Sequence, residues 1–349
     1  MAAEKKTSGV RPSIHSVAAY AGVSIATVSK VMHGDKTVRP ENVVSVQNAI
    51  EALGYRINPL AADLRRGRRK LVGIIVPSFD DPYYASFVGA LERQAERRGY
   101  ALAATSSRDS EKRELELVKR MEDWRVSGVI LVPVKDENGQ GARVLKASEM
   151  AAVFIDNVIG GTGGETIAFD YRAAIRDVVA QTARLGHQRM LVAVPDVRRP
   201  GPTRLASHLV ASLKAAVPGA AVQVLSAPTS REKLAEALAE IFGSAERPTL
   251  VLSFSEVAVT LTLNIARRLD WNVPEDLSLF SFKPVEWMRA IEPAIGSVQL
   301  PIDGAAVTIM DTIFQKIDNK AAAAHDQLLP CKIDFGQSMT TPRGQELSR

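Results

Sequence analysis

Residues 16–34 read SVAAYAGVSIATVSKVMHG and predict two short helices separated by a break at AGVS. Ser13 stands just before the first apolar-periodic residues, where it serves as an N-cap, and Gly22 supplies a left-handed stop. Ser24 caps the second helix, and Pro40 opens a third one. Three short helices within about 45 residues, the first two joined by a glycine turn, form a helix-turn-helix layout.

Each of these helices has one apolar face, spaced for packing against its neighbours. The apolar positions are Ile14, Val17, Ala18, Ala21, Val28, Val31, Met32, Val43, Val46, Ile50 and Leu53. The opposite face of the second helix holds Ile25, Ala26, Ser29 and Lys30. Small apolar side chains contact thymine methyl groups in the major groove, and a lysine donates to guanine. This face is therefore predicted to read DNA bases; a merely solvated face would expose Ile25 without gain.

Positive charge is concentrated at the start of the chain. Residues 1–70 hold 12 Lys and Arg against 5 Asp and Glu, whereas the remaining 279 residues hold 32 against 34. A basic module on a near-neutral body predicts a polyanionic partner for that module. A solvated basic tail is the alternative, but a tail does not need the helical pattern found here.

The composition is that of a soluble globular protein, with 46% hydrophobic and 24% charged residues among 349. Cys331 is the single cysteine, so no internal disulfide forms, and we expect a small buried residue there. The N-terminal residues lack the apolar segment of a secretory signal, and no apolar run is long enough to span a membrane, so a cytoplasmic protein is expected.

Signatures of catalysis are missing from the sequence. There is no serine nucleophile elbow, no metal-ligand spacing of histidines and no phosphate loop followed by lysine. The run GGTGG at residues 160–164 is predicted to be a flexible turn. We therefore expect no enzyme activity, no metal and no cofactor.

From residue 71 onward, short apolar runs alternate with helical segments such as 83–98 and 171–185. Strands are expected at 71–76, 101–105, 128–133, 151–156, 189–194, 221–226, 249–254 and 277–282. This alternation predicts parallel sheets with helices on both faces. Two such units in tandem leave a cleft at the carboxyl ends of the strands, where small ligands bind.

Two stretches carry a family resemblance, VAAYAGVSIATVSKVMHG and the later ALGYRINPLAADL. They resemble the DNA-binding headpiece of the LacI/GalR family of bacterial transcription regulators. The resemblance places Ile25, Ala26 and Lys30 at base-reading positions, and Ser29 lies on the same face. Contacts to DNA phosphates are expected from Ser24, Thr27, His33, Tyr55 and Asn58.

Residues 58–70 read NPLAADLRRGRRK, a helix of about two turns that is marginal alone in water. The resemblance implies a hinge helix whose Leu64 wedges between base pairs in the minor groove and kinks the duplex. Ala61 is small enough to let the twin helix of a second protomer approach. Asp63 departs from the neutral or basic residue common in the family. A flexible basic linker is the alternative.

The body resembles the periplasmic sugar-binding-protein-like domain of the same family, notably in VGIIVPSFDDPYYASFVGALERQAERRGYAL. The expected fold is an N-terminal all-α helix-turn-helix headpiece followed by an α/β periplasmic-binding-protein-like body of two Rossmann-like subdomains. The expected domains are a disordered tail (1–12), the headpiece (13–57), the hinge and linker (58–70) and an effector-binding and dimerisation domain (71–349). Within the last, the N-subdomain covers about 71–167 and 299–329, and the C-subdomain about 168–298 and 330–345.

The predicted effector cleft departs from the family pattern. The resemblance assigns it Asp81, Tyr83, Tyr84, Arg204, Ser255, Glu256 and Lys283. Ser255 and Glu256 replace an Asn–Asp pair, Lys283 replaces an aspartate, and residues 196–241 contain no aromatic ring to stack on a sugar. Arginine and lysine together suit an anion, so an acidic effector such as a sugar acid or sugar phosphate is predicted. The alternative is a Glu256–Lys283 ion pair that leaves no free cation.

These observations together predict a sequence-specific DNA-binding regulator, most simply a repressor, that binds a roughly palindromic operator and a small-molecule effector. No leucine heptad follows Arg343, so a homodimer is expected in preference to a tetramer. Activation in place of repression stays open. A ligand-binding protein without DNA regulation and an enzyme on a Rossmann-like body are the alternatives.

Overall fold

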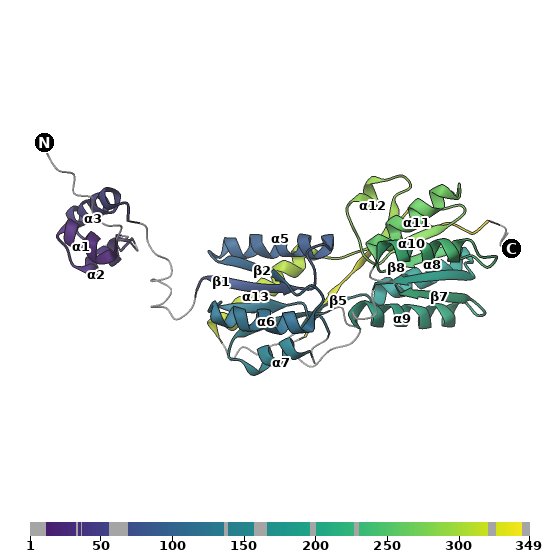
Figure 1. The fold of residues 1–349 in the computed structure, drawn as a ribbon, viewed down its shortest axis with the longest axis horizontal. Helices are drawn as coiled ribbons and strands as arrows, with labels where there is room; N and C mark the ends of the chain where they lie inside the picture. Colours follow the sequence, from purple (N-terminus) through teal and green to yellow (C-terminus); the bar gives the residue numbers. More distant parts are fainter. Residues whose placement is uncertain are drawn as a thin grey trace. The chain divides into compact units, whose positions relative to one another are not determined.

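A computed structural model of the chain describes residues 12–32, 34–35, 37–55, 69–135, 139–156, 166–195, 200–226, 230–319 and 326–343. The chain divides into two compact units, Met1–Gly67 and Arg68–Arg349 (Figure 1). Within the described ranges, every helix is too short or too polar to cross a lipid bilayer.

The described residues of the first unit form three helices, α1 (Ile14–Ala21), α2 (Ile25–Met32) and α3 (Pro40–Leu53). The hydroxyl of Ser13 accepts the backbone N–H of Ser16, and Gly22 ends α1 with a φ of 64°. The predicted three-helix layout is thereby confirmed, caps included.

The core of this unit is small. Its fully buried side chains are Val17, Ala18, Val28, Val46 and Ala49. The partly buried residues packed around them include Ile14, Val31, Met32, Ile50 and Leu53, as their helical spacing predicts.

The second unit contains two six-stranded sheets. The first has the order β11-β5-β4-β3-β1-β2 and the second the order β12-β10-β9-β8-β6-β7. The strands of the first sheet are β1 (Leu71–Val76), β2 (Ala101–Ser106), β3 (Gly128–Leu131), β4 (Ala151–Asp156), β5 (Thr166–Asp170) and β11 (Gln327–Pro330). Those of the second are β6 (Arg189–Val194), β7 (Ala221–Ser226), β8 (Leu250–Ser253), β9 (Ser278–Ser281), β10 (Ile295–Gln299) and β12 (Lys332–Gly336).

Helices cover both faces of each sheet, which confirms the predicted α/β architecture (Figure 1). The first sheet packs against α5 (Pro82–Arg97) and α13 (Ile302–Asp318) on one side, and α6 (Glu111–Asp123) and α7 (Gln140–Ala147) on the other. The second packs against α8 (Arg172–Leu185) and α9 (Pro200–Ala216) on one side. Its other side carries α10 (Arg231–Phe242), α11 (Glu256–Arg268) and the short α12 (Trp287–Ala290).

All eight expected strands are present, and four further ones, β5, β10, β11 and β12, were not expected. All four border the crossings between the sheets: β5 ends before Tyr171, β10 ends before Leu300, and β11 and β12 flank Cys331. The pair β10–β12 is antiparallel, so the expectation of wholly parallel sheets is wrong at this edge. Edge strands such as β12 alternate exposed and partly buried residues and lack the continuous apolar run of a central parallel strand.

Cys331 lies at the crossing between β11 and β12, where its backbone N–H donates to the carbonyl of Asp170 at 3.2 Å. The side chain is buried. Burial and the nearby Asp170 raise the pKa of the thiol to about 12. The expectation of a small buried residue is therefore confirmed. A thiol with a raised pKa stays protonated and is a poor nucleophile.

Glu114 of α6 is a fully buried carboxyl group beneath α7. Its Oε2 accepts the backbone N–H of Val134 at 2.7 Å, whereas Oε1 has no hydrogen-bond partner among the described residues. Gly141 leaves room for this carboxyl, because a Cβ there would lie 2.6 Å from Oε1. Desolvation by burial raises the pKa of Glu114 from 4.5 to about 7.

This shift predicts a pH-dependent stability. Between pH 4.5 and about 7 the folded chain holds a proton that the unfolded chain releases, so the free energy of unfolding falls as pH rises through that window. The loss amounts to at most about 3 kcal/mol. Because Glu114→Gln removes the titration, its stability relative to the wild type should improve with rising pH. Urea unfolding of both proteins across the window measures this, and parallel pH profiles would contradict it.

Candidate DNA-binding face and ligand cleft

The outer face of α2 carries the residues predicted to read bases. Ala26 and Lys30 are exposed, Ser29 is half-buried, and Ile25 is 36% exposed. An exposed isoleucine beside an alanine and a lysine gives a face that is apolar and cationic at once, which suits thymine methyl groups and guanine acceptors. Base contacts by these four residues remain a prediction.

Two contacts organise the ends of this helix. The Ser24 hydroxyl accepts the backbone N–H of Thr27 at 3.1 Å, as expected of a cap. At the other end the Lys30 ammonium lies 4.0 Å from a carboxylate oxygen of Asp35. Thr37 and, less strongly, Lys30 lower the pKa of Asp35. An exposed pair at this distance contributes little stability, so Lys30 is available to exchange Asp35 for a DNA acceptor.

The other predicted DNA contacts divide into two groups. Tyr55 is half-buried and packs against the headpiece core, and its backbone N–H donates to the carbonyl of Ile50 at 2.9 Å. The remaining expectations, for His33, Asn58, Ala61 and Leu64, lie outside the described residues.

An ion pair joins the two halves of the body. Asp81 is the N-cap of α5 beside the first sheet, and Lys283 follows β9 of the second sheet. The Lys283 ammonium is paired with Oδ2 of Asp81, and the two side chains are only 20% and 14% exposed. The ammonium also lies 5.7 Å from the ring centroid of Tyr83 and 5.5 Å from that of Tyr84.

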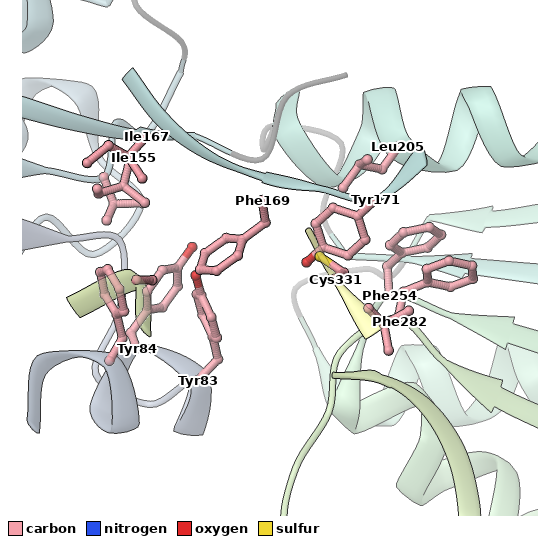
Figure 2. Close-up of a cluster of buried hydrophobic side chains, with 14 of the residues drawn as sticks. Tyr83, Tyr84, Ile155, Ile167, Phe169, Tyr171, Leu205, Phe254, Phe282 and Cys331 are labelled. Carbon is pink, nitrogen blue, oxygen red and sulfur yellow. The ribbon is translucent and has the colours of Figure 1, made fainter. Parts of the chain in front are cut away.

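Aromatic side chains dominate the cavity beside this pair. The cavity measures about 40 Å³ and is lined by Tyr83, Tyr84, Tyr171, Pro202, Leu205, Phe254, Phe282, Lys283 and Leu300. Phe254 and Phe282 are stacked with ring centroids 4.4 Å apart. Figure 2 shows Tyr83 and Tyr84 on one side of the cluster, and Tyr171, Phe254 and Phe282 gathered on the other. Burial raises the pKa of the Tyr83 and Tyr171 hydroxyls well above 10.0, so both are neutral donors.

A second, larger cavity of about 290 Å³ adjoins the first and shares Tyr83 and Leu300 with it. Its lining is more polar and includes Ser86, Glu286, Arg289, Ser297 and Gln299. Both cavities lie between α5 of the first sheet and the loop that follows β9 of the second. The cleft predicted between two α/β units is therefore present.

Four of the seven residues expected in the cleft, Asp81, Tyr83, Tyr84 and Lys283, come together there. The other three lie apart from both cavities. Arg204 is exposed on α9, Ser255 caps α11 by accepting the N–H of Ala258 at 3.3 Å, and Glu256 accepts the indole N–H of Trp287 at 3.0 Å. Arg204 lines neither of the two described cavities, so the Arg204–Lys283 anion clamp stays a prediction. Lys283 pairs with Asp81, whereas Glu256 was the alternative partner.

Sequence reasoning missed the aromatic lining. Residues 196–241 indeed contain no Phe, Tyr or Trp, but other parts of the chain supply the rings of Tyr171, Phe254 and Phe282. Phe254 directly follows β8, Phe282 directly follows β9, and Tyr171 directly follows β5. A residue just after a parallel strand points to the ligand end of the sheet, so this position was a usable signal.

A helix-turn-helix unit with an exposed apolar and cationic face, joined to a two-sheet body with a cleft, defines a transcription regulator that binds DNA. Residues 13–58 match the family of bacterial regulatory proteins of the lacI type, and residues 179–339 match the periplasmic binding protein-like domain. The chain belongs to the LacI family. As a member of this family, the chain is a DNA-binding transcription regulator.

Similarity to individual proteins extends over nearly the whole chain. Catabolite control protein A of Priestia megaterium is 24% identical over 329 residues, which is 93% of this chain and 98% of that protein. The transcriptional repressor PurR of Pectobacterium carotovorum is 25% identical over 326 residues, 89% of this chain and 92% of the relative. A crystal structure of the Lac repressor dimer bound to operator and the anti-inducer ONPF has a TM-score of 0.83 at 21% identity, covering 95% and 100% of the two chains. At this level of sequence identity, the similarity to the Lac repressor structure shows that the two chains share a fold.

Proposed function

We propose that this regulator is a repressor that binds a roughly palindromic operator as a homodimer and responds to a small-molecule effector in the cleft. The observation that carries the proposal is the outer face of α2, where Ile25, Ala26 and Lys30 are exposed on a helix whose other face packs against the headpiece core. The relative PurR is named a repressor, and the similar Lac repressor structure is a dimer on its operator.

The domain division expected from the sequence belongs to the same proposal. The headpiece covers residues 13–57, the hinge and linker 58–70, and the effector-binding and dimerisation domain starts at 71. The hinge residues Ala61 and Leu64 are proposed to enter the minor groove, with two copies needed for one kink.

For the effector we propose a small molecule with an anionic group, such as a sugar acid or sugar phosphate. Lys283 supplies a cation among the described lining residues, and the tyrosine rings offer faces on which a sugar ring stacks. Arg204 does not line the described cavities, so the proposal rests on Lys283.

Sedimentation equilibrium tests the assembly. We expect the protein to sediment with twice the mass of one chain, and its complex with a selected DNA duplex to contain two chains per duplex. A monomer, or one chain per duplex at saturation, would reject the homodimer on a palindrome.

A further inference from the structure

We propose that Asp81 is a resident anion that fills the anion site of Lys283, and that an effector carboxylate or phosphate must displace it. The inference rests on the proposed function, because it takes the cleft as the effector site. To that function it adds which chemical group of the effector is recognised, and that this group competes with Asp81 for Lys283.

The two oxygens of Asp81 have separate partners. Oδ1 accepts the backbone N–H of Tyr83 at 3.1 Å and caps α5. Oδ2 pairs with the Lys283 ammonium. A helix N-terminus favours a carboxylate, so Asp81 keeps its cap on α5 if Lys283 turns to another anion.

Lys283 is held in place for such an exchange. The Ser281 hydroxyl accepts the backbone N–H of Lys283 at 3.1 Å and donates to its carbonyl at 2.8 Å, which fixes the start of the side chain. The ring faces of Tyr83 and Tyr84 attract the ammonium. The cation therefore keeps its position when the carboxylate of Asp81 is replaced.

The cavity lined by Lys283 is too small for most ligands while the pair is formed. A cavity of about 40 Å³ holds a few water molecules, whereas pockets for small ligands usually measure about 300 Å³ or more. The adjoining cavity of about 290 Å³ has room for a ligand, and a ligand group that reaches from it to the Lys283 ammonium must compete with Asp81. A neutral ligand would leave the Lys283 ammonium, which is only 20% exposed, without an anionic partner, whereas an anion supplies one. The site thereby selects anions.

Displacement also has a mechanical consequence. Asp81 follows the first strand of one sheet, and Lys283 follows β9 of the other, so their ion pair ties the two halves of the body together. A diffusible anion that takes over Lys283 removes this tie and puts a ligand contact in its place. Anion binding is thereby linked to the relative position of the two halves, which is the coupling that an effector needs.

The variant Asp81→Asn tests the competition. Asparagine keeps an oxygen for the cap but carries no charge, so the anion site of Lys283 becomes vacant. Calorimetric titrations would use acetate, inorganic phosphate and gluconate as probes, with glucose as a neutral comparison, in low-chloride buffer. We expect Asp81→Asn to bind at least one anion about tenfold or more tightly than the wild type, and glucose no more tightly. The acetate and phosphate arms distinguish the two anion classes, and gluconate tests for a sugar acid.

Two further variants make the test specific. Asp81→Asn combined with Lys283→Met should lose the gain. Asp303→Asn removes the exposed partner of Arg93, 3.1 Å away on α13, and should bind anions as the wild type does. An Asp81→Asn protein that gains no anion affinity, or a gain that survives Lys283→Met, would overturn the inference.

DNA binding by the wild type is measured in parallel. If the wild type recognises no defined DNA site, the proposed regulator fails, whatever the anion titrations give. If it recognises a site and Asp81→Asn shows no gain, the regulator stands and the resident anion is rejected. Circular dichroism of each variant shows that the body is folded in the titrations.

Discussion

Val28→Asp is expected to abolish specific DNA binding, by more than about a hundredfold, while the body stays folded. Val28 is fully buried between the three helices of the headpiece, whose core has five buried side chains in the described part of the unit. Burying an unpaired carboxylate costs several kcal/mol, which is comparable to the whole stability of so small a unit. The headpiece forms a compact unit separate from the body, so the damage should stay local.

Val44→Asp is the matched control. Val44 lies on α3 of the same unit and is 55% exposed, so the same substitution there should leave the fold intact and weaken DNA binding only modestly. Fluorescence anisotropy with a selected duplex measures binding, and thermal unfolding followed by circular dichroism measures the body. Equal binding by both variants would show that the three-helix core is not required to present α2.

The second large effect is expected from Lys30→Ala. If Lys30 donates to a guanine, the substitution should cost about 1–3 kcal/mol for the preferred site, or roughly 5- to 150-fold in affinity. The loss should concentrate on one base position in each half-site. The ion pair with Asp35 is exposed and 4.0 Å long, so its removal should barely change the stability of the headpiece.

Arg39→Ala separates base reading from general attraction. Arg39 is an exposed cation next to α3 and is paired only loosely with Glu41, at 4.0 Å. Its loss should weaken binding to all duplexes alike and reduce the salt dependence slightly. Selection from a library of duplexes with each variant measures the base preference. An unchanged preference in Lys30→Ala would place this lysine on a phosphate and not on a base.

Local signals in the sequence predicted the headpiece almost completely. The caps at Ser13 and Ser24 and the left-handed Gly22 each satisfy a requirement of the backbone alone, so no tertiary information was needed. The central strands were equally predictable because both faces of a parallel strand are buried and leave a continuous apolar run. The edge strands β11 and β12 carry no such run, since their residues alternate between partly buried and exposed.

The cleft was predictable in position but only partly in composition. The family resemblance correctly predicted that Tyr83, Tyr84 and Lys283 lie in the cleft. It did not reveal that Lys283 would pair with Asp81, because the two residues are 202 positions apart and meet only when both sheets are placed. The exposure of Arg204 was not predictable for a similar reason. It depends on how α9 is rotated about its axis, and helical spacing alone does not fix that rotation near the start of a helix.

The most direct test of the central claim is capture of genomic DNA fragments by the purified protein at a stated salt concentration. We predict enrichment of a few fragments that share a roughly palindromic site with a flexible pyrimidine–purine step at its centre, located upstream of genes. Binding that fades with salt and leaves no shared site would contradict the claim, because it would make the headpiece a basic module that does not read sequence.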